Sequence, residues 1–191
     1  MILQYDAKVV QTKVVYYGPA MSGKTTSLRA LFATMKPGAE VKSIETSTGR
    51  TLFFDFGTLD VKGLEWTIKI TLYSTTGQDF YQSTRPATLF GVDGIVFVAD
   101  AQRSIMPYNK QSWNELHGFL SSMKKDVPVV VCMNKIDMPD VVSAEELRAG
   151  LELPRDRAIG IMPAIASQGI GVKEAFGVVM SRLFPNFQFA S

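Results

Sequence analysis

Residues 18–25 combine glycine, lysine and hydroxyl side chains in a spacing that suits a chain of phosphates. The segment Gly18-Pro19-Ala20-Met21-Ser22-Gly23-Lys24-Thr25 fits the pattern G-x-x-x-x-G-K-[ST]. Glycines let backbone N–H groups wrap a phosphate, the lysine reaches the terminal phosphates, and the threonine hydroxyl binds Mg²⁺. The pattern predicts a nucleoside triphosphate site with Mg²⁺ on Thr25, and with phosphate contacts from Gly18, Ala20, Met21, Ser22, Gly23, Lys24, Thr25 and Thr26.

The elements around this segment are those that a phosphate loop needs. Lys8–Tyr17 ends in a β-branched and aromatic run that predicts a buried strand. Thr25–Met35 has apolar residues at helical spacing and is closed by Pro37-Gly38. The alternative is a chance Gly/Ser turn, which the strand–loop–helix order disfavours.

A second polar segment, Asn134-Lys135-Ile136-Asp137, follows the apolar strand predicted over Pro128–Met133. A carboxylate at Asp137 can accept two hydrogen bonds from the N1–H and amino groups of guanine, whereas adenine presents the opposite pattern. The Lys135 stem can cover the purine face. On its own the tetrapeptide is a polar strand exit, but its position after a phosphate loop predicts GTP rather than ATP, with Asn134, Lys135 and Asp137 on the base.

Strands alternate with helices along the rest of the chain. Apolar or alternating patterns predict strands over Leu52–Phe56 (continuing to Val61), Thr67–Tyr73, Gly94–Asp100 and Ala158–Ile165. Helices are predicted after Ser74–Gln78, over Tyr108–Met123, from the capping box at Ser143, and up to Leu183. This order predicts a P-loop NTPase fold: three α/β/α layers around a six-stranded, mostly parallel sheet with one antiparallel edge strand.

Composition indicates an ordinary globular protein. The 191 residues are 46% hydrophobic and 20% charged, with a formal net charge of +2. We therefore expect a single domain over 1–191 and no nucleic-acid partner. The lone Cys132 suits a reducing cytoplasm, and we expect no direct membrane anchor because no apolar run approaches the ~18 residues of a membrane span.

The order and spacing of Gly18–Thr25, Gly77-Gln78 and Asn134–Asp137 resemble Ras-like small GTPases over nearly the whole chain. Within that superfamily, Arg50–Phe56 and Gly91–Asp100 look like the prokaryotic MglA-type GTPases. That subfamily is associated with cell polarity and motility, and its partners are Roadblock-type proteins that activate hydrolysis.

The resemblance assigns roles to further positions. Thr51 would contact Mg²⁺ and the γ-phosphate, and Gln78 after Gly77 would orient the attacking water. Arg50 would be an intrinsic arginine finger, although it is nearly as well explained as a solvated loop residue. Ala166 and Ser167 would present a backbone N–H to guanine, on a loop that the sequence specifies weakly.

Two departures from the usual pattern of these GTPases affect the expected Mg²⁺ binding and the expected rate of GTP hydrolysis. The Asp-x-x-Gly segment reads Ser74-Thr75-Thr76-Gly77, and a hydroxyl anchors Mg²⁺ less well than a carboxylate. MglA-type proteins also lack this aspartate. Asp55 either substitutes for it or faces solvent from its strand. Ala20 stands where Ras-like proteins usually have glycine, so we expect slow intrinsic hydrolysis.

The resulting expectation is a cytoplasmic GTPase switch. It would bind GTP or GDP with Mg²⁺, change the order of Thr46–Phe56 and Thr75–Leu89, and depend on an activating protein, with Roadblock-type regulators implied by the resemblance and the effector undetermined. The rival is a scaffold or heterodimer subunit that holds nucleotide without hydrolysing it, favoured by Ser74 and Ala20. An ATPase is a weaker third hypothesis, because Asn134–Asp137 argues against it.

Overall fold

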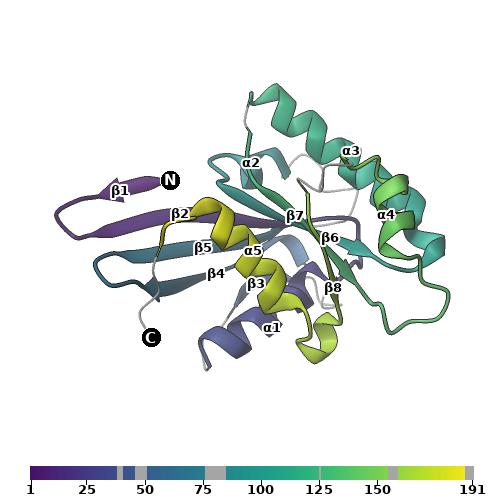
Figure 1. Ribbon diagram of the computed structural model, residues 1–191, viewed down its shortest axis with the longest axis horizontal. Helices are drawn as coiled ribbons and strands as arrows, with labels where there is room; N and C mark the ends of the chain where they lie inside the picture. The colour runs from purple at the N-terminus through teal and green to yellow at the C-terminus, as the bar shows by residue number, and fades with distance from the viewer. Residues whose placement is uncertain (38–40, 46–50, 76–84, 125, 155–158, 188–191) are drawn as a thin grey trace.

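The computed structural model describes residues 1–37, 41–45, 51–75, 85–124, 126–154 and 159–187. Strands and helices alternate along these ranges (Figure 1). The strands are β1 (Ile2–Gln4), β2 (Val9–Tyr17), β3 (Lys42–Glu45), β4 (Thr51–Lys62), β5 (Thr67–Thr75), β6 (Gly94–Asp100), β7 (Val129–Asn134) and β8 (Ile161–Ala164). The helices are α1 (Lys24–Met35), α2 (Arg85–Leu89), α3 (Met106–Ser122), α4 (Ala144–Gly150) and α5 (Val172–Leu183), with short 3₁₀ turns η2 (Arg103–Ile105) and η3 (Ala166–Gln168).

One sheet organises the molecule, in the order β3-β4-β5-β2-β6-β7-β8, with β1 also paired to β2. The five strands from β5 to β8 are parallel, as predicted. The predicted number of six strands, with one antiparallel edge strand, is too low. The described residues form an eight-stranded sheet in which β1, β3 and β4 all pair antiparallel to their neighbours. Sequence patterning missed β1 and β3 because a short edge strand needs only backbone pairing and no apolar periodicity.

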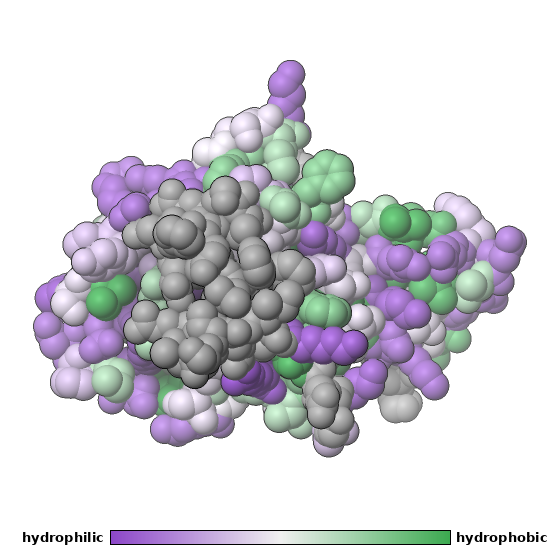
Figure 2. Space-filling model, turned by 180° about the vertical axis from the view of Figure 1, so that it is seen from behind, coloured by the Kyte–Doolittle hydropathy of each residue, from purple (hydrophilic) through white to green (hydrophobic). Residues whose placement is uncertain are grey.

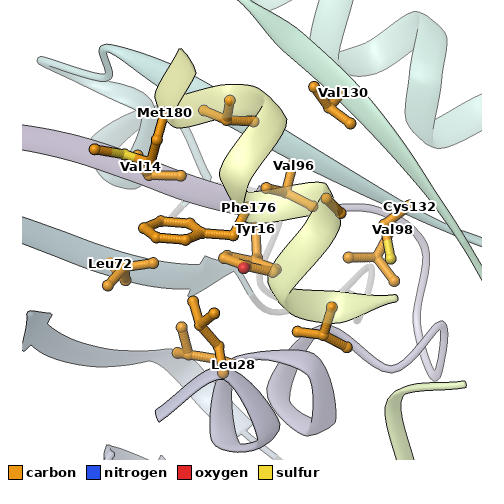
Figure 3. Close-up of a cluster of buried hydrophobic side chains, with 14 of the residues drawn as sticks. Val14, Tyr16, Leu28, Leu72, Val96, Val98, Val130, Cys132, Phe176 and Met180 are labelled. Atoms are coloured by element: carbon orange, nitrogen blue, oxygen red, sulfur yellow. The ribbon is translucent and has the colours of Figure 1, made fainter. Parts of the chain in front are cut away.

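Helices cover both faces of the sheet, which confirms the three-layer α/β/α arrangement. Alternation along β2 sends Val14 and Tyr16 to the face covered by α1 and α5, and Val15 and Tyr17 to the face covered by α2, α3 and α4. Figure 3 shows the first of these cores, where Phe176 of α5 and Leu28 of α1 converge on Tyr16. Both cores hold the central parallel strands in place.

The phosphate loop and the polar segments lie where the parallel strands end. β2, β6, β7 and β8 run in the same direction, so their carboxyl ends meet at one edge of the sheet. Tyr17 leads directly into the phosphate loop, Asn134 ends β7, and Ala164 precedes η3. This edge is therefore the candidate site.

The opposite end of the sheet projects as two hairpins, β1–β2 and β4–β5 (Figure 1). They carry several exposed apolar side chains, among them Ile2, Leu3, Tyr5 and Leu64. Seen from behind, this projecting lobe carries hydrophobic residues interspersed among hydrophilic ones (Figure 2). In the part of the chain that the structure describes, no helix is long and apolar enough to cross a membrane.

Candidate functional site

Two glycines of the phosphate loop have backbones that a side chain would not tolerate. Gly18 has φ +148° and Gly23 has φ +99°. A Cβ on Gly18 would lie 2.2 Å from the Val98 carbonyl oxygen, and one on Gly23 would lie 2.2 Å from Asn134 Nδ2. The loop is thus packed closely against the ends of β6 and β7. This explains why the sequence has glycine at both positions.

Lys24 begins helix α1 and folds back across the loop. Its Nζ donates hydrogen bonds to the Gly18 oxygen at 2.9 Å and the Pro19 oxygen at 2.6 Å. The side chain is buried, and burial lowers the lysine pKa to about 7, with a further lowering from the nearby Arg85. A phosphate chain would oppose this effect, because negative charge close to an ammonium favours its protonated form.

The next residue, Thr25, meets a carboxylate on a different strand. Its Oγ1 donates to Asp55 Oδ2 at 2.5 Å. Asp55 is fully buried and shares a face of β4 with Gly57 and Leu59, both packed toward α1. Of the two alternatives for Asp55, the solvent-facing one is therefore wrong.

Asp55 also lies directly opposite Ser74 in the β4–β5 ladder. Ser74 is fully buried, and its Oγ has no hydrogen-bond partner among the described residues. A hydroxyl on Thr25, a carboxylate on Asp55 and an unpartnered hydroxyl on Ser74 form an oxygen-rich set that suits Mg²⁺, which takes one or two carboxylates and completes its shell with phosphate and water. Asp55 therefore places a carboxylate across the ladder from the Ser74 hydroxyl.

Asn134 joins the phosphate loop to the segment after β8. Its Nδ2 donates to the Ser22 oxygen at 2.8 Å, and its Oδ1 accepts from the Ala166 N–H at 2.9 Å. The residue is buried, so both bonds are shielded from water. Asn134 thus acts as a brace between two loops. Because the Ala166 N–H is engaged here, the exposed Ser167 is the better candidate for the predicted contact to guanine.

The two charged residues of the same motif have different surroundings. Lys135 has φ +65°, and its Nζ bonds to Asp100 Oδ2 at 2.5 Å. Asp100 is buried, and its bond to Lys135 fixes the position of the lysine ammonium group. The aliphatic part of the Lys135 side chain then forms a flat surface on which a purine ring could pack. Asp137 is exposed and has no ion pair within the described ranges. A free carboxylate beside a fixed lysine stem is suited to a purine edge and face.

The structure brings together only part of the predicted site. The loop residues Ala20, Met21 and Thr26 are exposed beside Lys24 and Thr25, while Ser22 is buried. Thr51 is the first residue of β4, opposite Glu45, and its side chain is not described. Arg50, Gly77 and Gln78 lie outside the described residues.

Sequence analysis missed a buried ion pair at the start of α2. Arg85 follows residues 76–84, is 4% exposed, and pairs with Glu115 of α3. The hydroxyl of Tyr17, the residue before the phosphate loop, lies near both groups but completes no hydrogen bond with described residues. The cluster connects α2, α3 and the end of β2. No sequence signal marks it, because the pairing joins residues that are far apart in the chain.

Comparison with known proteins covers nearly the whole chain. The model of the ADP-ribosylation factor family matches residues 2–183. The mutual gliding-motility protein MglA of Myxococcus xanthus is 38% identical over 187 residues, which is 93% of this chain and 92% of that protein. Ypt/Rab-type GTPase Rab7 of Neurospora crassa is 28% identical over 90% of this chain and 82% of its own length. Translation initiation factor IF-2 of Syntrophotalea carbinolica is 30% identical over 68% of this chain, but only 12% of that protein is covered.

Proposed function

The chain belongs to the ADP-ribosylation factor family of Ras-like small GTPases, and on that premise we propose how its residues bind, read and hydrolyse GTP and what the switch serves. It is a GTP-binding switch and an enzyme that hydrolyses GTP. The observation that carries the proposed mechanism is the contact between Thr25 and Asp55, because it joins the phosphate loop to β4. β4 begins at Thr51, and both Thr51 and Asp55 lie within Thr46–Phe56, one of the two segments expected to change with nucleotide.

Mg²⁺ would be held by the Thr25 hydroxyl, with Thr51 as the second protein ligand and Asp55 as the nearby carboxylate. The bound ion would neutralise charge on the β- and γ-phosphates. Asp55 and Ser74 are both fully buried, so their oxygens are held in position rather than shared with solvent. The support for a metal at this position is chemical: the half-buried Thr25 hydroxyl, the buried Ser74 hydroxyl and the buried Asp55 carboxylate lie next to the phosphate loop.

Catalysis would consist of positioning and charge stabilisation. The Lys24 ammonium, held across the loop, would exchange its bonds to Gly18 and Pro19 for phosphate oxygens. Gln78 would orient the attacking water, and Arg50 would stabilise charge that develops on the transferred group. Ala20 places a methyl group on the loop near this chemistry, so we expect a slow rate without an activating protein.

Guanine would be recognised by Asp137 and by the flat surface that Lys135 forms. Asp137 can accept the two N–H donors of guanine, and adenine would leave that carboxylate unpaired. Asn134 would act indirectly, because both of its amide atoms are engaged with Ser22 and Ala166. Ser167 would offer the backbone N–H predicted for the guanine carbonyl.

The relative named for mutual gliding motility suggests the biological setting. We infer that this switch acts in the cytoplasm on cell polarity or motility, and that a Roadblock-type protein activates its hydrolysis. Support comes from the 38% identity to that protein over nearly the full length of both chains. The rival hypothesis of a non-hydrolysing scaffold loses one of its two supports, since Asp55 supplies a carboxylate where Ser74 has none.

Single-turnover GTP hydrolysis with Mg²⁺ tests the mechanism, with nucleotide occupancy checked in every sample. We expect a slow rate in the wild-type protein and a lower one in both Gln78→Ala and Arg50→Ala. Loss in Gln78→Ala alone would remove Arg50 from the mechanism. Adding a Roadblock-type protein from the same source should accelerate the wild-type rate, and no acceleration would contradict that partnership.

A further inference from the structure

The side chain of Asp100 joins the end of β6 to the segment that follows β7. Asp100 is the last residue of β6 and is 2% exposed. Its Oδ1 accepts a hydrogen bond from the Gln102 N–H at 3.0 Å, and its Oδ2 accepts one from Lys135 Nζ at 2.5 Å. Both oxygens of this carboxylate are therefore engaged within the protein, and one of them holds a residue of the predicted guanine site.

Asn109 of α3 holds the backbone of the same aspartate. Its Oδ1 accepts a hydrogen bond from the Asp100 N–H at 3.0 Å, and its Nδ2 donates one to the Asp100 carbonyl oxygen at 2.7 Å. Asn109 is fully buried, so water does not compete for either bond. The main chain of Asp100 is fixed by Asn109 and its carboxylate by Gln102. Asp100 is thus a rigid anchor to which the lysine side chain must adapt.

Lys135 reaches this anchor from an unusual backbone conformation. Its φ is +65°, in the left-handed region that residues other than glycine rarely adopt. Its side chain is 30% exposed, and Asp100 is its one ion-pair partner within the described ranges. The next carboxylate along the chain is Asp137, in the turn that the Met138 N–H closes onto the Lys135 oxygen at 3.1 Å. A Lys135 ammonium released from Asp100 would therefore have a second carboxylate within its own turn.

We propose that Asp100 sets the specificity for guanine by holding the Lys135 ammonium away from Asp137. This inference rests on the proposed function, in which Asp137 accepts two hydrogen bonds from guanine. An ammonium on one Asp137 oxygen leaves a single acceptor for the base, so guanine loses one of the two bonds that distinguish it. Asp100 acts through Lys135 and is a positioning residue.

The size of the effect follows from the competition for the Asp137 oxygens. An exposed ion pair changes an equilibrium by a factor of up to about 5. A hydrogen bond to a charged acceptor changes it by a factor of about 10 to 100. Loss of Asp100 should therefore reduce the discrimination between purine bases without abolishing nucleotide binding.

Inosine diphosphate (IDP) is the probe, because it differs from GDP only in lacking the 2-amino group. By titration calorimetry with Mg²⁺, we expect the wild-type full chain to bind IDP about 10- to 100-fold more weakly than GDP. In Asp100→Asn, which keeps the side-chain shape and an acceptor for the Gln102 N–H, this ratio should fall about 5-fold. Asp140→Asn, the same change at an exposed carboxylate that pairs with Arg103, should leave the ratio unchanged.

The double variant Asp100→Asn/Lys135→Met separates positioning from a purely structural role. Methionine keeps an apolar chain for the purine face and removes the ammonium, so nothing competes for Asp137 and the IDP-to-GDP ratio should return to the wild-type value. An unchanged ratio in Asp100→Asn, or a double variant with the same reduced ratio, would overturn the proposal. If Asp100→Asn does not fold, the ratio in the double variant decides alone. Equal binding of IDP and GDP by the wild-type protein would contradict the proposed guanine contact of Asp137, and this inference with it.

Discussion

Asp55 Oδ2 accepts a hydrogen bond from the Thr25 hydroxyl at 2.5 Å, and this contact places a buried carboxylate beside the phosphate loop, on the strand next to the one that usually carries an aspartate. The usual aspartate position on β5 is occupied by Ser74, which pairs directly with Asp55 in the antiparallel β4–β5 ladder. Side chains opposite each other in such a ladder share a face and lie within about 5.5 Å at Cβ. The two positions can therefore serve the same metal.

Replacing Asp55 with Asn should weaken Mg²⁺ binding while retaining the shape of the side chain. We expect about a 10- to 100-fold loss of Mg²⁺ affinity, the range found when a group that supports a metal site is removed. The measurement is Mg²⁺-dependent retention of a fluorescent GDP analogue. Asp60→Asn is the matched control, since Asp60 is an exposed carboxylate on the same strand. Equal effects of the two substitutions would exclude Asp55 from the site.

Moving the carboxylate back across the ladder should rescue that defect. In Asp55→Asn/Ser74→Asp, the aspartate returns to β5, opposite the new asparagine. We expect Mg²⁺ affinity to recover most of the loss, because the oxygen set at Thr25 again includes one carboxylate. Ser74→Asp alone should bind more weakly than the double variant, since it buries two like charges side by side. The same fluorescence assay measures all four proteins, and failure to recover would mean that Asp55 acts through protein structure rather than through the metal.

Sequence patterning predicted the two loops that meet at this edge of the sheet, but it left Asp55 between two alternatives. The loop from Gly18 to Thr25 and the segment from Asn134 to Asp137 carry their chemistry in consecutive residues. The order of these segments and of the predicted strands and helices around them also predicts the parallel core of the sheet. By contrast, Asp55 is a single polar residue within a predicted strand, and nothing in the neighbouring sequence marks it as buried. Its burial depends on α1 covering that face of β4, where Phe32 packs so closely on Gly57 that a Cβ there would lie 2.3 Å from its ring.

The Arg85–Glu115 pair lay beyond prediction for the same reason. Its two residues belong to different helices, and neither occurs in a motif that marks a pairing. The extra strands β1 and β3 were missed because edge strands are specified by backbone pairing, which leaves little pattern in the side chains. What the sequence predicts well is local chemistry in consecutive residues. Pairings across strands and helices require the fold.

Asn134 and Asp137 belong to one motif but should respond differently to substitution. Asn134→Ala leaves the buried Ser22 oxygen and Ala166 N–H without their partner, and each such group costs about 1–3 kcal/mol. We expect a lower free energy of unfolding and weaker binding of both GDP and GTP. Asp137→Asn should weaken guanine nucleotide binding without changing the free energy of unfolding, because Asp137 is exposed. Urea denaturation of the nucleotide-free proteins, paired with GDP titration, separates the two. A destabilised Asp137→Asn protein would contradict this division.

Breaking the Arg85–Glu115 ion pair should lower the free energy of unfolding, whereas replacing both residues with apolar ones should change it little. Arg85→Met leaves Glu115 partly buried without its partner, and we expect a loss of about 2–4 kcal/mol in the free energy of unfolding. Arg85→Met/Glu115→Leu should recover most of that loss, since no uncompensated charge remains. The exposed ion pair between Lys110, which lies on the same helix as Glu115, and Glu152 is the control, and Lys110→Met should change stability by less than about 1 kcal/mol. A double variant no more stable than Arg85→Met would show that the two side chains do not act as a pair.

Cys132 should be inert in the folded protein. It lies in the middle of β7, it is 1% exposed, and burial raises the pKa of its thiol to about 12. The thiol therefore stays protonated well above pH 9, and thiolate is the reactive form. An aromatic disulfide reagent at pH 8 should label the protein only after unfolding. Because the unfolded thiol ionises near pH 9 and the folded thiol near pH 12, this residue should lower stability progressively as pH rises through that window. Comparing the pH dependence of urea unfolding with that of Cys132→Ala measures this contribution, and identical slopes above pH 9 would show that the thiol is not shielded.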